Sequence, residues 1–151
     1  MEVARPARAA DLAGCRRLVA AALDAATAMR GGAALRGSAT TDSLLARWTG
    51  GDAAQLFVGE YEGAVVGLAA ASAGPGAGEG RRGLIECCYV EPGARGVGVG
   101  TALMDAAVAW CATRGCSEVD ALALPGDRAT KQRLEATGFT ARLLTLNRRL
   151  G

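Results

Sequence analysis

Hydrophobic and polar positions along the chain follow two different periods, and together they predict a mixed α/β protein. Apolar residues recur at helical spacing in the segments expected to be helices, which cover residues 11–29, 41–48, 101–113 and 129–136. Shorter apolar or alternating runs predict strands at residues 2–5, 55–61, 64–71, 84–90, 118–124 and 139–150. The expected order of elements is therefore β, α, α, β, β, β, α, β, α, β.

Two stretches between these elements are predicted to be loops. Residues 33–40 separate the first two helices. Residues 72–83 contain five glycines and one proline, and we expect them to be the most flexible connection in the chain. Because strands are expected on both sides of this segment, it should join two antiparallel strands rather than two domains.

The segment at residues 84–104 has the order strand, glycine loop, helix, which is typical of a site for phosphate groups. A helix N-terminus exposes unpaired N–H groups and the positive end of the helix dipole. Glycines before the helix let an anion approach these groups, and Arg95 adds a fixed cation. The predicted pyrophosphate site consists of Arg95 and the backbone of the six residues that follow: Gly96, Val97, Gly98, Val99, Gly100 and Thr101.

Three phosphate-binding patterns compete for this loop. A P-loop is excluded because no lysine precedes Thr101. For a dinucleotide-binding fingerprint the loop lacks the last glycine. Asp120, however, lies about twenty residues downstream, where that fingerprint has an acidic residue that binds the ribose. A nicotinamide-dependent oxidoreductase therefore stays open as one hypothesis. The third pattern, Arg-x-x-Gly-x-Gly, is satisfied by Arg95, Gly98 and Gly100.

Length and composition narrow the class of protein. The 151 residues suit one domain, and a net charge of +2 from 17 basic and 15 acidic residues does not indicate a nucleic-acid-binding protein. No apolar stretch has the length of a membrane span and no signal peptide is evident, so we expect a cytoplasmic protein without membrane contact. Five cysteines without a Cys-x-x-Cys pair argue against disulfides or zinc, and the absence of histidine excludes histidine-based catalysis and metal sites; no metal is predicted.

The Arg-x-x-Gly-x-Gly pattern resembles the signature of the GNAT (GCN5-related) N-acetyltransferase superfamily. Further matches stand at the spacing of that family: Val90 and Pro92 before the loop, and Gly138-Phe139 after the last expected helix. The element order resembles the GNAT fold along nearly the whole chain, so one domain is expected over residues 1–151. The resemblance implies an α/β (α+β) fold with a mixed, mostly antiparallel sheet, a splayed parallel strand pair and about four helices.

The resemblance also implies the reaction. An acetyl group would move from acetyl-CoA, bound as cosubstrate, to a small-molecule or peptide amine that attacks it directly in a ternary complex. The pantetheine arm would pair with the backbone of Cys88, Tyr89 and Val90, and Asp127 takes the place of an Asn at the coenzyme arm. A homodimer is compatible with the resemblance.

Two departures from the family pattern affect the predicted chemistry. Leu134 occupies the place of the Tyr that protonates the leaving thiolate in many relatives, and leucine has no proton to give. Asp127 loses two N–H donors compared with Asn and adds a negative charge. A second hypothesis follows from Leu134, namely a non-catalytic module that binds acyl-CoA as a sensor or partner subunit.

Glu86 is the candidate general base. Strict alternation along the strand would place it on one face with Leu84, Cys88 and Val90. A carboxylate in an apolar strand is unfavourable unless it is paired or functional, so Glu86 either acts as base through water or is hydrogen-bonded at the strand edge. Cys88 as a nucleophile is a weaker hypothesis, because a thiolate needs a nearby cation and the strand carries none.

Overall fold

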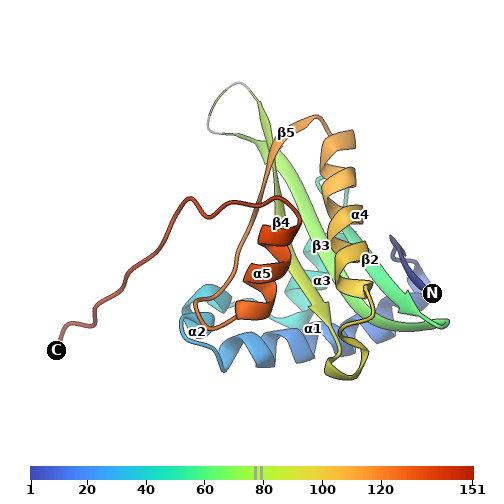
Figure 1. The fold of residues 1–151 in the computed structure, drawn as a ribbon, viewed down its shortest axis with the longest axis horizontal. Coiled ribbons are helices and arrows are strands. Elements are labelled where there is room, and N and C mark those ends of the chain that lie inside the picture. Colours follow the sequence, from blue (N-terminus) through green and yellow to red (C-terminus); the bar gives the residue numbers. More distant parts are fainter. Residues whose placement is uncertain (77, 79) are drawn as a thin grey trace.

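The computed structural model of the chain describes residues 1–76, 78 and 80–151, and its centre is a five-stranded sheet (Figure 1). The strands lie in the order β1-β2-β3-β4-β5, with antiparallel pairing between all neighbours except the parallel pair of β4 and β5. Their bounds are Glu2–Pro6 for β1, Ala54–Tyr61 for β2, Ala64–Pro75 for β3, Arg81–Val90 for β4 and Cys116–Ala121 for β5. This architecture confirms the predicted mixed, mostly antiparallel sheet.

Helices cover both faces of the sheet, so the protein has three layers (Figure 1). The α-helices are α1 at Leu12–Thr27, α2 at Gly32–Arg36, α3 at Thr41–Thr49, α4 at Val99–Thr113 and α5 at Arg128–Ala136. Short 3-10 turns precede α1 at Ala9–Asp11 and α4 at Pro92–Ala94. Among the residues that the structure describes, no helix is long and apolar enough to cross a bilayer.

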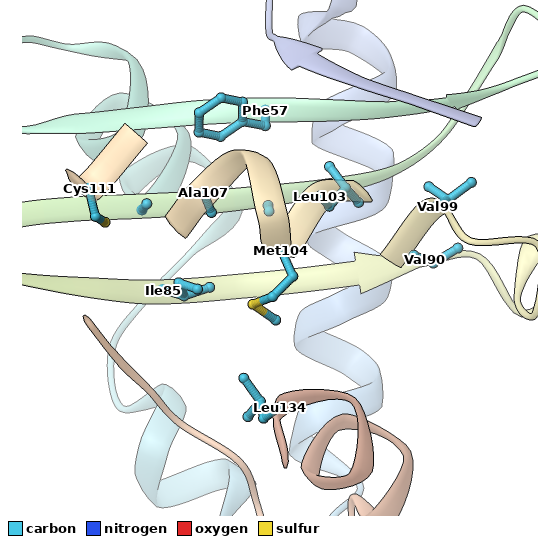
Figure 2. Packing of buried hydrophobic residues seen from close by; sticks show 11 residues of the cluster. Phe57, Ile85, Val90, Val99, Leu103, Met104, Ala107, Cys111 and Leu134 are labelled. Atoms are coloured by element: carbon cyan, nitrogen blue, oxygen red, sulfur yellow. The ribbon is translucent and has the colours of Figure 1, made fainter. Parts of the chain in front are cut away.

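Each face of the sheet has its own hydrophobic core. The α4-side core lies between the sheet and helices α4 and α5, with Leu103 and Met104 of α4 at its centre (Figure 2). The α1-side core lies on the other face and includes Leu18 of α1 and Trp48 of α3. Full burial of a leucine stabilises a protein by about 2 kcal/mol, so both layers of helices are held to the sheet largely by such contacts.

The parallel pair of β4 and β5 separates halfway along its length. Residues Arg81 to Ile85 of β4 pair with Cys116 to Ala121 of β5, where β5 ends. Strand β4 continues to Val90, and its last residues pair only with β3 among the described strands. This is the splayed pair that was predicted.

Two predicted loops are largely structured. Helix α2 covers the first half of the loop predicted at residues 33–40 and begins one residue before it, at Gly32. Ala33, Ala34 and Leu35 are good helix formers, and glycines with positive φ flank the helix, Gly31 at 80° and Gly37 at 55°. Most of residues 72–83 also pairs as sheet, since β3 runs to Pro75 and β4 begins at Arg81. The flexible connection predicted there falls in part on residues 77 and 79, which lie outside the described residues.

The strand predicted at residues 139–150 is wrong, because the structure has no regular element after α5. The segment runs away from the sheet (Figure 1). Its pattern has no single apolar face, since Leu143 and Leu144 are adjacent and would point to opposite sides of a strand. Its four leucines are between 80% and 91% exposed: Leu143, Leu144, Leu146 and Leu150.

Candidate active site

The glycine loop turns sharply from the end of β4 into the start of α4. Gly96 and Gly98 have φ values of 85° and 92°, in the left-handed region that favours glycine. Gly98 is the N-cap of α4, and its carbonyl accepts the first helical hydrogen bond from Ala102 at 3.0 Å. The helix therefore begins at Val99, two residues before the predicted Thr101, and its first N–H groups have no partner within the helix.

Arg95 is fixed by two contacts at the end of β4. Its Nε donates a hydrogen bond to the carbonyl of Val90 at 2.9 Å, and its guanidinium lies 5.6 Å from the ring centroid of Tyr89. A cation over an aromatic ring is attracted to the ring electrons. These contacts hold the loop against the strand, and Arg95 is exposed at the surface.

A pocket of about 260 Å³ opens between the glycine loop and helix α5; we call it the loop pocket. It contains most of the predicted pyrophosphate site, together with one cation that the sequence analysis missed, Arg133 of α5. Its lining residues are Val90, Ala94, Arg95, Gly96, Gly98, Gly100, Thr101 and Arg133. Val97 and Val99 are absent from this lining and pack instead with the α4-side core.

The guanidinium of Arg133 lies over the first turn of α4. A Cβ built at Gly100 would lie only 2.6 Å from Cζ of Arg133, so the cation occupies space that the missing side chain leaves open. The charge of the same guanidinium also acts on the Cys88 thiol, where it opposes the effect of burial on the pKa.

The strict alternation predicted along β4 is wrong, because the strand has a β-bulge at Glu86. Ala70 pairs with Cys87 and Ala71 with Ile85, so Glu86 is skipped in the register with β3. The extra residue reverses the faces after it, as β-bulges do. Cys88 therefore packs against the α4-side core together with Ile85, and not on the face of Glu86.

Glu86 points to the opposite face and forms an ion pair with Arg47 of α3, with a distance of 3.0 Å between Nη2 and Oε1. The Glu86 side chain is 10% exposed, whereas that of Arg47 is 60% exposed. The second carboxylate oxygen, Oε2, is buried and has no hydrogen-bond partner among the described residues. A buried, half-satisfied carboxylate is unfavourable unless another donor reaches it.

The surroundings of Cys88 differ from those predicted, because Arg133 of α5 places near the thiol a cation that β4 itself lacks. Burial nevertheless raises the pKa of the Cys88 thiol, and the charge of Arg133 only partly opposes this effect. Burial also raises the pKa of the neighbouring Cys87 to about 12. Both thiols are therefore protonated near neutral pH, which argues against a nucleophilic cysteine.

The two departures from the family pattern have structural roles on α5. Asp127 caps the helix: its carboxylate accepts hydrogen bonds from the Thr130 N–H at 3.1 Å and from the Thr130 hydroxyl at 2.6 Å. It does not line the loop pocket. Leu134 is 7% exposed and points toward Met104 and Ile85 in the α4-side core (Figure 2). Leu134 thus packs in the core at the position where the family pattern has a tyrosine that donates a proton.

Comparison with known proteins identifies the family. A sequence model described as the acetyltransferase (GNAT) family matches residues 35–139, which is more than half of the chain. The chain belongs to this family. A search of curated protein sequences finds no match.

Solved structures share the fold over nearly the whole chain. An aminoglycoside N-acetyltransferase, AAC(6')-Iy, solved in complex with CoA, is 22% identical and has a TM-score of 0.72, covering 99% of this chain and 96% of that chain. A ribosomal-protein-alanine N-acetyltransferase from Brucella melitensis is 18% identical with a TM-score of 0.74, covering 99% and 100%. A transcriptional regulator from Bacillus halodurans is 18% identical with a TM-score of 0.75, covering 99% and 100%. These likenesses establish a common fold, which is shared by proteins with different functions.

Proposed function

We propose that this chain is an acetyl-CoA-dependent N-acetyltransferase with a single domain over residues 1–151. The observation that carries the proposal is the loop pocket, where Arg95, Arg133 and the N-terminus of α4 meet beside the open half of β4. Membership of the acetyltransferase family supports the same activity. A structure of AAC(6')-Iy holds the bisubstrate analogue CoA-S-monomethyl-acetylneamine, and this supports an amine acceptor.

The residues present fit the phosphate end of acetyl-CoA. The backbone of residues 96–101 offers N–H groups to the diphosphate, and Arg95 and Arg133 balance its charge. The open half of β4, from Cys88 to Val90, has backbone groups that β5 does not pair. These groups suit the amides of a pantetheine arm, which can pair with them as a neighbouring strand would.

Acetyl-CoA supplies an activated thioester, and attack by the amine forms the amide C–N bond while the C–S bond breaks. Glu86 accepts the proton that the amine loses, either directly or through a water molecule. The unpartnered Oε2 supports this role, because it is a buried acceptor without a donor among the described residues. Glu86 and the loop pocket lie on opposite faces of the sheet, so acceptor and coenzyme reach the open half of β4 from different sides.

Calorimetric titration of acetyl-CoA into wild type and a Gly98→Val variant tests the coenzyme site. A valine at φ 92° is strained and also meets the Glu2 side chain, so the loop should open and binding should weaken at least tenfold. Gly63→Val is the matched control, since Gly63 also has a positive φ of 83° but lies in the turn between β2 and β3. Equal affinity in wild type and Gly98→Val would contradict the assigned coenzyme site.

A Glu86→Gln variant tests the base. With an amine that the wild type acetylates, we expect turnover to fall about 100-fold or more, whereas the Kd for acetyl-CoA should change less than about threefold. Glu60→Gln is the matched control, because Glu60 is also a partly buried strand carboxylate paired with an arginine, Arg5. Full turnover by Glu86→Gln at every pH would remove Glu86 from this role.

A second candidate function is a non-catalytic module that binds acyl-CoA. The observation in its favour is the buried Leu134, which leaves no proton donor for the leaving thiolate at that position. A thiolate of ordinary pKa, about 8.5, can leave without protonation, so this absence does not exclude catalysis. Tight binding of acetyl-CoA without acetyl loss across a broad panel of small-molecule and peptide amines would favour the module.

A further inference from the structure

Arg133 is a cation without a counter-ion in the described structure. It is partly buried between α5 and the glycine loop, and it forms no ion pair with a carboxylate of the described residues. Arg95, on the other side of the loop pocket, forms none either. The carboxylate of Glu2 lies against Gly98 but does not line the pocket.

The position of Arg133 is electrostatically unfavourable in the absence of an anion. The N-terminus of α4 carries the positive end of the helix dipole, and a cation placed there is repelled. Arg133 lies directly over this turn, beside Gly100, and shares the pocket with Arg95. Partial burial weakens the screening of this repulsion by water. Three positive groups in one pocket indicate that its ligand carries more than one negative charge.

We infer that Arg133 is the second phosphate-binding cation of the site, and that helix α5 closes over the diphosphate of the coenzyme through this side chain. The inference rests on the proposed function. A guanidinium binds phosphate oxygens in pairs, and Arg95 and Arg133 stand on the loop side and the α5 side of the pocket. A diphosphate between them would receive one arginine from each side and N–H groups from the start of α4.

Gly100 has a specific reason to be glycine under this assignment. The guanidinium of Arg133 rests where a Cβ of residue 100 would stand, with Nη1 and Nε only 2.8 and 2.9 Å from that point. A side chain there would push Arg133 out of the loop pocket. Gly100 is therefore required by the approach of the cation and not by its own backbone angles, in contrast to Gly98.

Binding of CoA to Arg133→Gln tests the inference by calorimetry at several salt concentrations. We expect the Kd to rise about tenfold or more, because one charge-assisted contact is lost. The dependence of affinity on salt should also become less steep, since one fewer charge is neutralised. Arg133→Lys should recover most of the affinity. Arg128→Gln, an exposed charge at the start of the same helix, should bind like wild type.

Two further measurements separate this role from a structural one. The melting temperature of Arg133→Gln without ligand should equal or exceed that of wild type, because a repelled cation has been removed. Pantetheine, which has the thiol arm but no diphosphate, should bind Arg133→Gln and wild type equally well. A lower melting temperature without rescue by lysine, or an equal loss of pantetheine affinity, would overturn the inference.

The outcomes distinguish the inference from the proposed function. Suppose that wild type acetylates amines and that Arg133→Gln changes the Kd for CoA by less than threefold. The role of Arg133 would then be overturned, whereas the proposed reaction would stand. Wild type that binds CoA through Arg133 but acetylates no amine would overturn the reaction and leave the role of Arg133 standing. Wild type that does not bind CoA would overturn both.

Discussion

Single charged residues fix the first strand to the rest of the protein. Arg5 of β1 lies 2.8 Å from Asp11 and 2.6 Å from Glu60 of β2, measured between side-chain nitrogen and oxygen. Hydrogen bonding by Arg5, followed by that of the Arg8 backbone, lowers the pKa of Asp11 from 3.8 to about 2. The folded state thus favours the ionised form of Asp11 more than the unfolded state does.

This difference predicts a pH dependence of stability. The contribution of Asp11 should be fully present above about pH 4 and should be lost as the pH falls toward 2, because the unfolded chain takes up the proton first. Urea unfolding of wild type and Asp11→Asn should therefore give different free energies of unfolding at pH 7 that converge near pH 2. A difference between the two proteins that stays constant over this range would contradict the assigned ion pair.

The residues of the site differ in how far the sequence could predict them. Gly96, Gly98 and Arg95 were predictable because a glycine loop before a helix is a local pattern. Arg133 was not predicted, because only the packing of α5 against the loop brings it within reach of Gly100. For the same reason the partner of Glu86, Arg47, comes from a helix about forty residues earlier in the chain and carries no local signal.

At the scale of elements, α4 packs unusually close to the sheet. A Cβ built at Gly59 of β2 would lie 2.5 Å from Cγ1 of Val99, the first residue of α4, and 3.0 Å from Cδ1 of Leu103. The helix can take this position only where the strand lacks a side chain. The start of α4, and with it the glycine loop, is therefore positioned by a residue far from the loop in sequence.

Replacement of Gly59 by alanine should destabilise the protein and displace the loop. We expect the free energy of unfolding to fall by about 1–3 kcal/mol, the usual effect of overpacking a core. Gly74→Ala is the control, because no atom lies within 4 Å of a Cβ at that strand position. Urea denaturation measures both, and equal stability of the two variants would contradict the close approach of α4.

The elements that the sequence predicted well have a strong apolar pattern. Helices α1, α3 and α4 each have one apolar face, whereas strands β2 and β3 are apolar on both faces and contribute to both cores. All five lie within a few residues of their predicted bounds. The faces of β4 were predicted wrongly, because a bulge adds one residue without changing the apolar pattern. The last strand failed because adjacent leucines at 143 and 144 do not specify a face.

At the scale of the whole molecule, the C-terminal segment contributes little to the packing. Its four leucines are exposed, and its ion pairs to the body come from Arg142, which lies 3.5 Å from Glu118 and 3.6 Å from Asp120 on β5. Exposed ion pairs of this kind stabilise a protein by less than about 1 kcal/mol. Stability therefore resides in the two cores on either side of the sheet.

Simultaneous replacement of these leucines by serine tests this distribution of stability. The melting temperature should change by less than about 2 °C, because surface substitutions away from packed groups have small effects. The changed positions are Leu143, Leu144, Leu146 and Leu150. A fall of several degrees in a thermal melt followed by circular dichroism would mean that the segment packs against the protein in solution.

The early end of β5 has a consequence for the hydrogen bonds of the backbone. Beyond Ile85, the groups of β4 that face away from β3 have no strand to bond to among the described residues. The Val90 carbonyl accepts a hydrogen bond from Arg95, and the other groups must bond to water or to a bound molecule. Under the proposed function, the amides of the coenzyme arm replace that water. The sheet would then be completed in each catalytic cycle by the substrate itself and opened again when the product leaves.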